Sequence, residues 1–245
     1  MDIFGQTHQG IKKNHNEDSF WYDESLGAAI VSDGMGGEAA GEIASRITVE
    51  TFKDSLRFKL QNAESLIEVK AVIANSISES NLEVLSSSKK SPAFHRMGAT
   101  AVCACLWNES FVVANIGDSR AYLVREGRIK QLTTDHSFIR KLLEKGAISR
   151  EEALTHPQRN RITRYIGNKE NARADFFDIA ALPGDFLILC SDGLSSVVPE
   201  NDMLNIVRKN PSIGEMAEEF IQKTLEGGAP DNVTVVLLRP VEYIK

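Results

Sequence analysis

Two strand-like apolar runs in this chain end in the same way, on an aspartate followed by a glycine. The first run covers residues 28–32 and leads into Asp33, and the second covers residues 186–191 and leads into Asp192. Glycine allows the backbone to approach neighbouring groups closely, so each acid is expected at a crowded strand end. A fold that contains both runs must place two carboxylates at the ends of buried strands.

Further acids stand in similar surroundings. A third apolar run, residues 112–116, ends just before Asp118, and other acids lie in turn-like sequence at Glu17, Asp18 and Asp231. Carboxylates gathered at strand ends repel one another unless a cation neutralises them. Hard divalent cations prefer oxygen ligands of this kind. The pattern therefore predicts a metal site and, with it, phosphate chemistry.

Other interpretations of the same residues remain open. A single Asp-Gly pair more often marks a turn than a metal ligand. The glycines after Asp33 also imitate a dinucleotide-binding turn, but Asp33 would place its charge beside the pyrophosphate, and no second strand ending in an acid follows. The spacing of an EF-hand calcium loop is absent from the sequence.

Composition narrows the class of protein. The 245 residues contain no Pro/Ser/Gly-rich linker, so we expect one domain over residues 1–245. The net charge of −6, without a dense basic stripe, argues against nucleic-acid binding. The three cysteines lack zinc-site spacing and are expected as buried thiols. There is no signal pattern and no apolar run of roughly 20 residues, so we expect a cytoplasmic protein without membrane contact.

The periodicity of apolar residues predicts a mixed fold. Helical spacing is found over residues 40–56, 64–85 and 213–225, and a helix-and-loop insertion is expected at about 137–166. Short apolar runs predict an antiparallel meander at 99–107, 111–116, 121–124 and 129–132. Later strands are expected at 175–181, 186–190 and 233–238. Helix pairs that alternate with strand blocks indicate an α+β fold, with two antiparallel sheets face to face and helices outside.

A set of short motifs follows in a fixed order along the chain. The motifs are Asn16-Glu17-Asp18, Asp33-Gly34-Met35-Gly36-Gly37, Gly41-Glu42, Gly98-Ala99-Thr100, Gly117-Asp118-Ser119-Arg120, Ser191-Asp192-Gly193-Leu194 and Asp231-Asn232-Val233-Thr234. Together they resemble the metal-dependent protein serine/threonine phosphatases (PPM, type 2C) in their short bacterial form. The resemblance covers about residues 6–238. It implies a four-layer α-β-β-α sandwich with a flap at about 137–166.

The resemblance also implies a set of metal ligands for Mn²⁺ or Mg²⁺. Asp33 would bridge two ions, the carbonyl of Gly34 would join the second, and Asp192 and Asp231 would complete the first. Asp118 would hold a third, weaker ion together with Asp192. Glu17 and Asp18 would act on the ions through bound waters, or as neighbours of the direct ligands.

The implied activity is hydrolysis of phosphoserine and phosphothreonine in proteins. Water activated by two metal ions would attack phosphorus directly, without a phosphoenzyme. Asp33, Asp192 and Lys13 would be the catalytic residues, and we expect a monomer that opposes a cognate serine/threonine kinase. Two alternatives stay open: a phosphatase for a regulatory switch protein or a small phosphate ester, and a non-catalytic module that binds phosphoproteins. The complete set of acids disfavours the last one.

Several positions depart from the family pattern or allow two interpretations. Lys13 stands where many relatives carry a phosphate-binding arginine, and lysine offers a point charge instead of a fork. Glu38 stands where bacterial relatives often have histidine, so the general acid is unassigned. Arg161 and Arg164 of the flap would bind acidic or phosphorylated substrate, or form a solvated face. His136, like His15, is expected to be structural.

Overall fold

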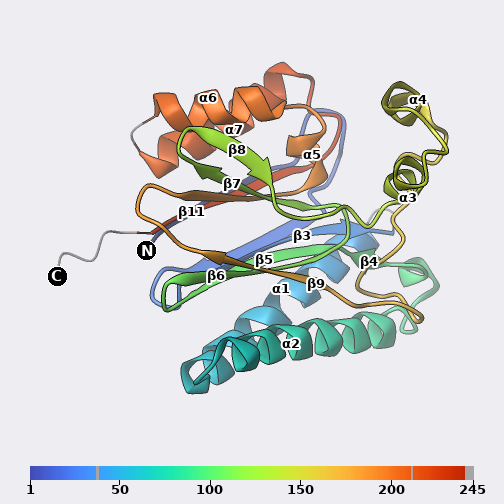
Figure 1. The fold of residues 1–245 in the computed structure, drawn as a ribbon. Coiled ribbons are helices and arrows are strands. Elements are labelled where there is room, and N and C mark those ends of the chain that lie inside the picture. The colour runs from blue at the N-terminus through green and yellow to red at the C-terminus, as the bar shows by residue number, and fades with distance from the viewer. Residues whose placement is uncertain (37–38, 211, 241–245) are drawn as a thin grey trace.

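The chain folds into four layers, in which two antiparallel sheets pack face to face and helices cover both outer faces (Figure 1). The computed structural model describes residues 1–36, 39–210 and 212–240. Glu38, which the sequence singled out, lies outside these residues. The predicted α+β sandwich with outer helices is confirmed.

Both sheets are built from antiparallel pairs. The five-stranded sheet has the order β1 (Asp2–His8), β11 (Val233–Arg239), β10 (Phe186–Cys190), β7 (Arg120–Arg125) and β8 (Arg128–Gln131). The six-stranded sheet has the order β2 (Asp18–Asp23), β3 (Ala28–Met35), β5 (Ala101–Trp107), β6 (Ser110–Ile116) and β9 (Asp175–Ala180), with β4 (Gly98–Ala99) paired to β3.

Helices cover the two outer faces and one end of the sandwich. The six-stranded sheet packs against α1 (Ala39–Lys59) and α2 (Leu66–Ser87), and the five-stranded sheet against α5 (Asp192–Ser195), α6 (Glu200–Lys209) and α7 (Ile213–Glu226). The flap contains α3 (Phe138–Glu144) and α4 (Arg150–Thr155), and two 3₁₀ turns are η1 (Leu60–Asn62) and η2 (Pro92–Phe94). Figure 1 shows the flap at the end of the sheets opposite the N-terminus. Serine side chains fix several helix starts; Ser65, for example, accepts a hydrogen bond from the amide of Glu68.

The apolar side chains form a core between each pair of layers. Along β3, Ile30 points toward the helices, whereas its neighbour Val31 points into the space between the sheets. Because successive side chains of a strand point to opposite faces, a strand covered on both sides has apolar residues at every position. This explains why the inner strands read as continuous apolar runs in the sequence.

One part of the predicted topology is wrong. The sequence predicted one meander over residues 99–132, but β5 and β6 belong to the six-stranded sheet, whereas β7 and β8 belong to the five-stranded sheet. The chain crosses between the sheets at Gly117, where φ is +115° and a Cβ atom would lie 2.6 Å from Thr100. Only glycine fits this conformation and spacing. The crossing brings Asp118 to the junction of the two sheets.

In the ranges 1–36, 39–210 and 212–240, no helix is long and apolar enough to cross a membrane.

Candidate metal centre

Strand pairing brings five aspartates to one end of the sandwich. Asp18 of β2 lies directly opposite Asp33 of β3. In the other sheet, Asp192 follows β10 and Asp231 precedes β11, and these two strands are paired. Asp118 precedes β7, the other neighbour of β10. Acids that are far apart in the sequence therefore converge where the two sheets meet.

The carboxylates of this group are close enough to change one another's ionisation. Burial raises the pKa of Asp33 well above its usual range, and the charges of Asp18, Asp192, Asp118 and Asp231 raise it further. Burial and the charge of Asp231 raise the pKa of Asp192, and a hydrogen bond with Asp33 lowers it in part. The metal-free centre therefore favours protonated carboxyl groups.

Two other members of the group have strongly raised pKa values. Burial raises the pKa of Asp118 to about 8, and the charges of Asp192 and Asp135 add to this effect. Burial also raises the pKa of Asp18 to about 7, although hydrogen bonds from Thr234 and Ser191 favour the ionised form. Both acids gain a proton at a pH where an exposed aspartate has none.

Asp18 is the most deeply placed of the five acids, with 7% of its surface exposed. Its Oδ2 atom accepts hydrogen bonds from Ser191 Oγ at 2.8 Å and from Thr234 Oγ1 at 2.6 Å. The Thr234 amide donates in turn to Ser191 Oγ at 3.0 Å. This network fixes one oxygen of Asp18 and leaves the other available.

Three carboxylate oxygens in this region are buried without a hydrogen-bond partner among the described residues. They are Glu17 Oε1, Asp18 Oδ1 and Asp192 Oδ1. A buried anionic oxygen that lacks a donor is costly, and a cation removes that cost. The acceptor-only chemistry of this set fits a hard divalent cation.

The carboxylates do not form a complete cage by themselves. Over residues 1–36, 39–210 and 212–240, no group of three or more His, Cys, Asp or Glu side chains is arranged to hold a metal ion. Ions such as Mg²⁺ keep several of their waters and need only one or two carboxylates in direct contact. The separation of the acids is therefore compatible with such an ion.

Close backbone contacts at two glycines hold the strand ends together. A Cβ atom on Gly193 would lie 1.8 Å from the carbonyl oxygen of Asn232, and one on Gly34 would lie 2.1 Å from the carbonyl oxygen of Gly41. Any larger residue would push these segments apart. The contact at Gly193 keeps Asp192 next to the turn that carries Asp231.

Asn232 connects this turn to the N-terminal loop, a role that the sequence did not reveal. Its Oδ1 atom accepts a hydrogen bond from the amide of Glu17 at 2.9 Å. Its Nδ2 atom donates to the carbonyl oxygens of Gln9 and His15, each at 2.8 Å. The motif Asp231-Asn232 marked the residue, but its partners lie more than 200 positions away.

Lys13 brings a positive charge into contact with the acidic group. Its Nζ atom lies 2.6 Å from Asp231 Oδ1, and both side chains are partly exposed. Burial lowers the pKa of Lys13, but the hydrogen bond and charge of Asp231 outweigh it, so the pKa is raised overall. Lys13 therefore remains charged beside the acids, as a residue that attracts phosphate must. That it binds substrate stays a prediction.

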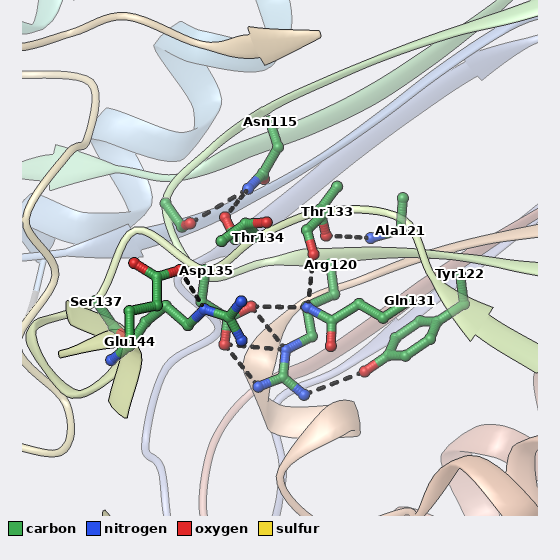
Figure 2. A network of polar contacts seen from close by, with 12 residues as sticks. Asn115, Arg120, Ala121, Tyr122, Gln131, Thr133, Thr134, Asp135, Ser137 and Glu144 are labelled. Atoms are coloured by element: carbon green, nitrogen blue, oxygen red, sulfur yellow. Dashed lines mark hydrogen bonds and ion pairs between the residues drawn. The ribbon is translucent and has the colours of Figure 1, made fainter. Parts of the chain in front are cut away.

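A polar network connects β7 to the base of the flap (Figure 2). The Arg120 guanidinium holds the Asp135 carboxylate through Nε at 2.9 Å and through its terminal nitrogen at 2.7 Å, and it also donates to Tyr122. Gln131 donates to the same carboxylate at 3.0 Å. Because Arg120 stands two residues after Asp118, this network fixes the chain on the flap side of the acidic group.

The predicted substrate arginines have intramolecular partners. Arg164 forms a two-point ion pair with Asp175, at 2.7 and 2.9 Å. Asp175 also contacts Nε2 of His136 at 3.0 Å, and Nδ1 of this buried histidine accepts from the Gly117 amide. Arg161 lies 5.2 Å from the centre of the Phe138 ring. His136 is thus held as a structural residue, and contact of the arginines with substrate stays a prediction.

The sequence and the fold both match known proteins. The family model of protein phosphatase 2C matches residues 7–166. The serine/threonine phosphatase stp of Listeria monocytogenes is 37% identical over 95% of this chain and 93% of its own length. PstP of Mycobacterium tuberculosis is 34% identical over 97% of this chain, which spans 45% of PstP.

Solved structures give the same result. A serine/threonine phosphatase of S. agalactiae superposes with a TM-score of 0.92 at 29% identity, over 98% of this chain and 99% of that one. A PstP catalytic domain in complex with two manganese ions superposes with a TM-score of 0.85 at 30% identity, over 98% of both chains.

The chain belongs to the protein phosphatase 2C family. It is an enzyme, a serine/threonine protein phosphatase of the bacterial type.

Proposed function

We propose that this phosphatase hydrolyses phosphoserine and phosphothreonine in proteins with two divalent cations, Mn²⁺ or Mg²⁺. Asp33, Asp192 and Asp231, with the carbonyl of Gly34, would hold the pair. The observation that carries the proposal is the convergence of acids from both sheets around buried oxygens that lack a donor. A related PstP catalytic domain contains two manganese ions, which supports the same conclusion.

The remaining acids have secondary positions in this proposal. Glu17 and Asp18 would act on the ions through bound waters, or as neighbours of the direct ligands. Asp118 and Asp192 would hold a third, weaker ion. When bound, the ions would lower the pKa of a water molecule and neutralise charge on the phosphoryl oxygens.

Direct attack of water on phosphorus requires no phosphorylated side chain, and the cysteines of the protein are poor candidates for one. All three cysteines are buried, and burial raises the pKa of both Cys103 and Cys190 to about 12. Burial also raises the pKa of Cys105. A thiol with such a pKa is not a nucleophile near neutral pH. The charged Lys13 would draw the substrate phosphate toward the acids and hold it there.

The proposed substrates are phosphoproteins, which the names of the relatives support. A cognate serine/threonine kinase would produce them, and the enzyme would act as a monomer in the cytoplasm.

Metal-dependent turnover tests this function. The purified protein should hydrolyse p-nitrophenyl phosphate and a phosphothreonine peptide with Mn²⁺, and EDTA should abolish both activities. Asp192→Asn should remove activity, because the variant loses one ligand charge while its shape is nearly unchanged. Exposed Asp54→Asn is the matched control and should retain full activity. Peptide binding without turnover in the metal-loaded wild type would show a binding module instead.

A further inference from the structure

A cavity of about 470 Å³ opens between the end of α2 and the chain that leaves the flap. Its lining comes from three segments, which meet only in the folded protein. The lining residues that matter here are Lys89, His95, Arg96, Met97, Tyr165 and Lys169.

The cavity is positively charged although the chain as a whole carries a net charge of −6. Lys89, Arg96 and Lys169 line it, and Glu170 is the one acid of the lining. Over the residues that the structure describes, none of these three cations takes part in an ion pair. All three side chains are exposed, so an anion can reach them.

The backbone at Arg96 provides an independent observation. Its φ angle is +68°, a conformation that glycine adopts at much lower cost than arginine. Three other non-glycine residues have positive φ in the described ranges. Asn108 and Glu126 lie in the tight turns of the β5–β6 and β7–β8 hairpins, and Ala229 lies in the turn after α7. Arg96 is the third residue of a type II turn over residues 94–97, which a hydrogen bond from the Met97 amide to the Phe94 carbonyl oxygen closes at 3.3 Å, and this position favours glycine over arginine. Unfavourable backbone angles concentrate at ligand sites, which points to a role for this side chain.

The position of the cavity relates it to catalysis. A Cβ atom on Gly36 would lie 2.8 Å from the Cα atom of Met97, so β3 ends against the cavity wall. Gly36 follows Asp33 by three residues, which correspond to roughly 10 Å of extended chain. A substrate segment of about three extended residues can therefore reach from the acidic group to the cavity.

We propose that this cavity binds a second anionic group of the phosphoprotein, about three to five residues from the phosphoresidue that is hydrolysed. The group is a carboxylate or a second phosphate, since both offer several acceptor oxygens to lysine and arginine. This inference rests on the proposed function, because it assumes that the substrate is a phosphorylated chain. It explains why a cationic cavity adjoins a centre made of acids.

The test compares phosphothreonine peptides that differ only at a distance from the scissile phosphate. The first peptide carries aspartates three to five residues from the scissile phosphothreonine, the second carries another phosphothreonine at that distance, and the third carries serines. Each substitution is made once on the N-terminal side and once on the C-terminal side of the scissile residue. Two exposed ion pairs should raise kcat/KM for the anionic peptides about fivefold at low salt. Added salt should reduce this preference. The larger of the two preferences identifies the natural group.

Variants assign the preference to the cavity. Arg96→Gly removes the charge and also relieves the backbone, so the variant should be at least as stable as the wild type. In the double variant Arg96→Gly/Lys89→Ala, the ratio of kcat/KM for an anionic peptide to that for the serine peptide should fall close to one. Turnover of p-nitrophenyl phosphate and of the serine peptide should be unchanged. Lys130→Ala on β8 is the charge control and Asn108→Gly is the backbone control. Both should retain the preference.

Two results would overturn the inference while the proposed function stands. The wild type would hydrolyse all peptides equally well, or the double variant would keep the full preference. Failure of the wild type to hydrolyse any phosphopeptide in the presence of metal would instead overturn the proposed function, and this inference with it.

Discussion

Asp118 stands directly after Gly117, where the chain crosses between the two sheets. Its burial raises its pKa to about 8, and the charges of Asp192 and Asp135 add to this effect. If it holds the third ion, Asp118→Asn should reduce turnover about 10- to 100-fold. Calorimetric titration with Mn²⁺ should still show the two tighter sites. Full activity in this variant would remove Asp118 from the reaction.

Lys13 offers a second test at the level of a single side chain. Because its charge lies 2.6 Å from Asp231, it is positioned at the rim of the acidic group. Lys13→Ala should raise KM for a phosphothreonine peptide several-fold, and Lys13→Arg should largely restore it, since both residues carry a positive charge. Steady-state kinetics at saturating Mn²⁺ measure the effect. An alanine variant with a lower KM would contradict the role.

At the level of elements, the contact between α5 and the chain before β11 controls the distance between two proposed ligands. Gly193→Ala would place a Cβ atom 1.8 Å from the Asn232 carbonyl oxygen, so the backbone must move. We expect this variant to lose Mn²⁺ affinity and stability together, measured by calorimetry and thermal unfolding.

The matched control for this variant is Gly214→Ala in α7. A Cβ atom there would meet its nearest neighbour at 4.0 Å, and alanine favours a helix over glycine by up to about 1 kcal/mol. Gly214→Ala should therefore be neutral or stabilising. Unchanged Mn²⁺ binding by Gly193→Ala would show that the contact is not required.

The elements differ in how well the sequence predicted them. Helices α1, α2 and α7 have strong helical periodicity and the inner strands are continuous apolar runs, and the structure confirms these elements. Strands β1 and β2 and helix α6 were not predicted. The polar sequence of β1 becomes a strand because it pairs with β11, with Ile3 opposite Leu238. Such a pairing depends on residues more than 200 positions away, so no local pattern can reveal it.

In the candidate metal centre too, local sequence patterns revealed some residues, whereas contacts between distant segments were not predictable. The acids of the motifs were found because strand ends and glycines mark them in the sequence. The residues that hold them in place were missed, since a hydrogen bond from Thr234 to Asp18 depends on the register of two sheets. The crossing at Gly117 was missed for a similar reason: a glycine turn looks the same whether the chain continues in one sheet or enters the other.

For the whole molecule, the raised pKa values predict how stability depends on pH. A carboxyl group whose pKa rises from 3.8 to about 7 or 8 on folding, as for Asp18 and Asp118, binds more protons in the folded state. The stability that such a group contributes is fully present below its pKa in the unfolded chain. It is lost as the pH rises through its pKa in the folded protein. Protein treated with EDTA should therefore melt at progressively lower temperature between about pH 5 and pH 8.

Metal should reverse this trend, because it binds the ionised carboxylates and stabilises the folded state by mass action. With saturating Mn²⁺, the melting temperature at pH 8 should rise more than that at pH 5. Thermal unfolding with and without Mn²⁺ measures both effects. A metal-free protein whose melting temperature is constant over this range would contradict the electrostatic account of the centre.

The pairing of β1 with β11 has a consequence for how the enzyme is made. Ribosomes release the N-terminal strand long before the segment that contains Asp231, which we propose as a metal ligand. A nascent polypeptide that has not reached β11 has no working centre, however well its earlier helices have formed. Catalysis is therefore expected only from enzyme molecules whose translation has passed that strand.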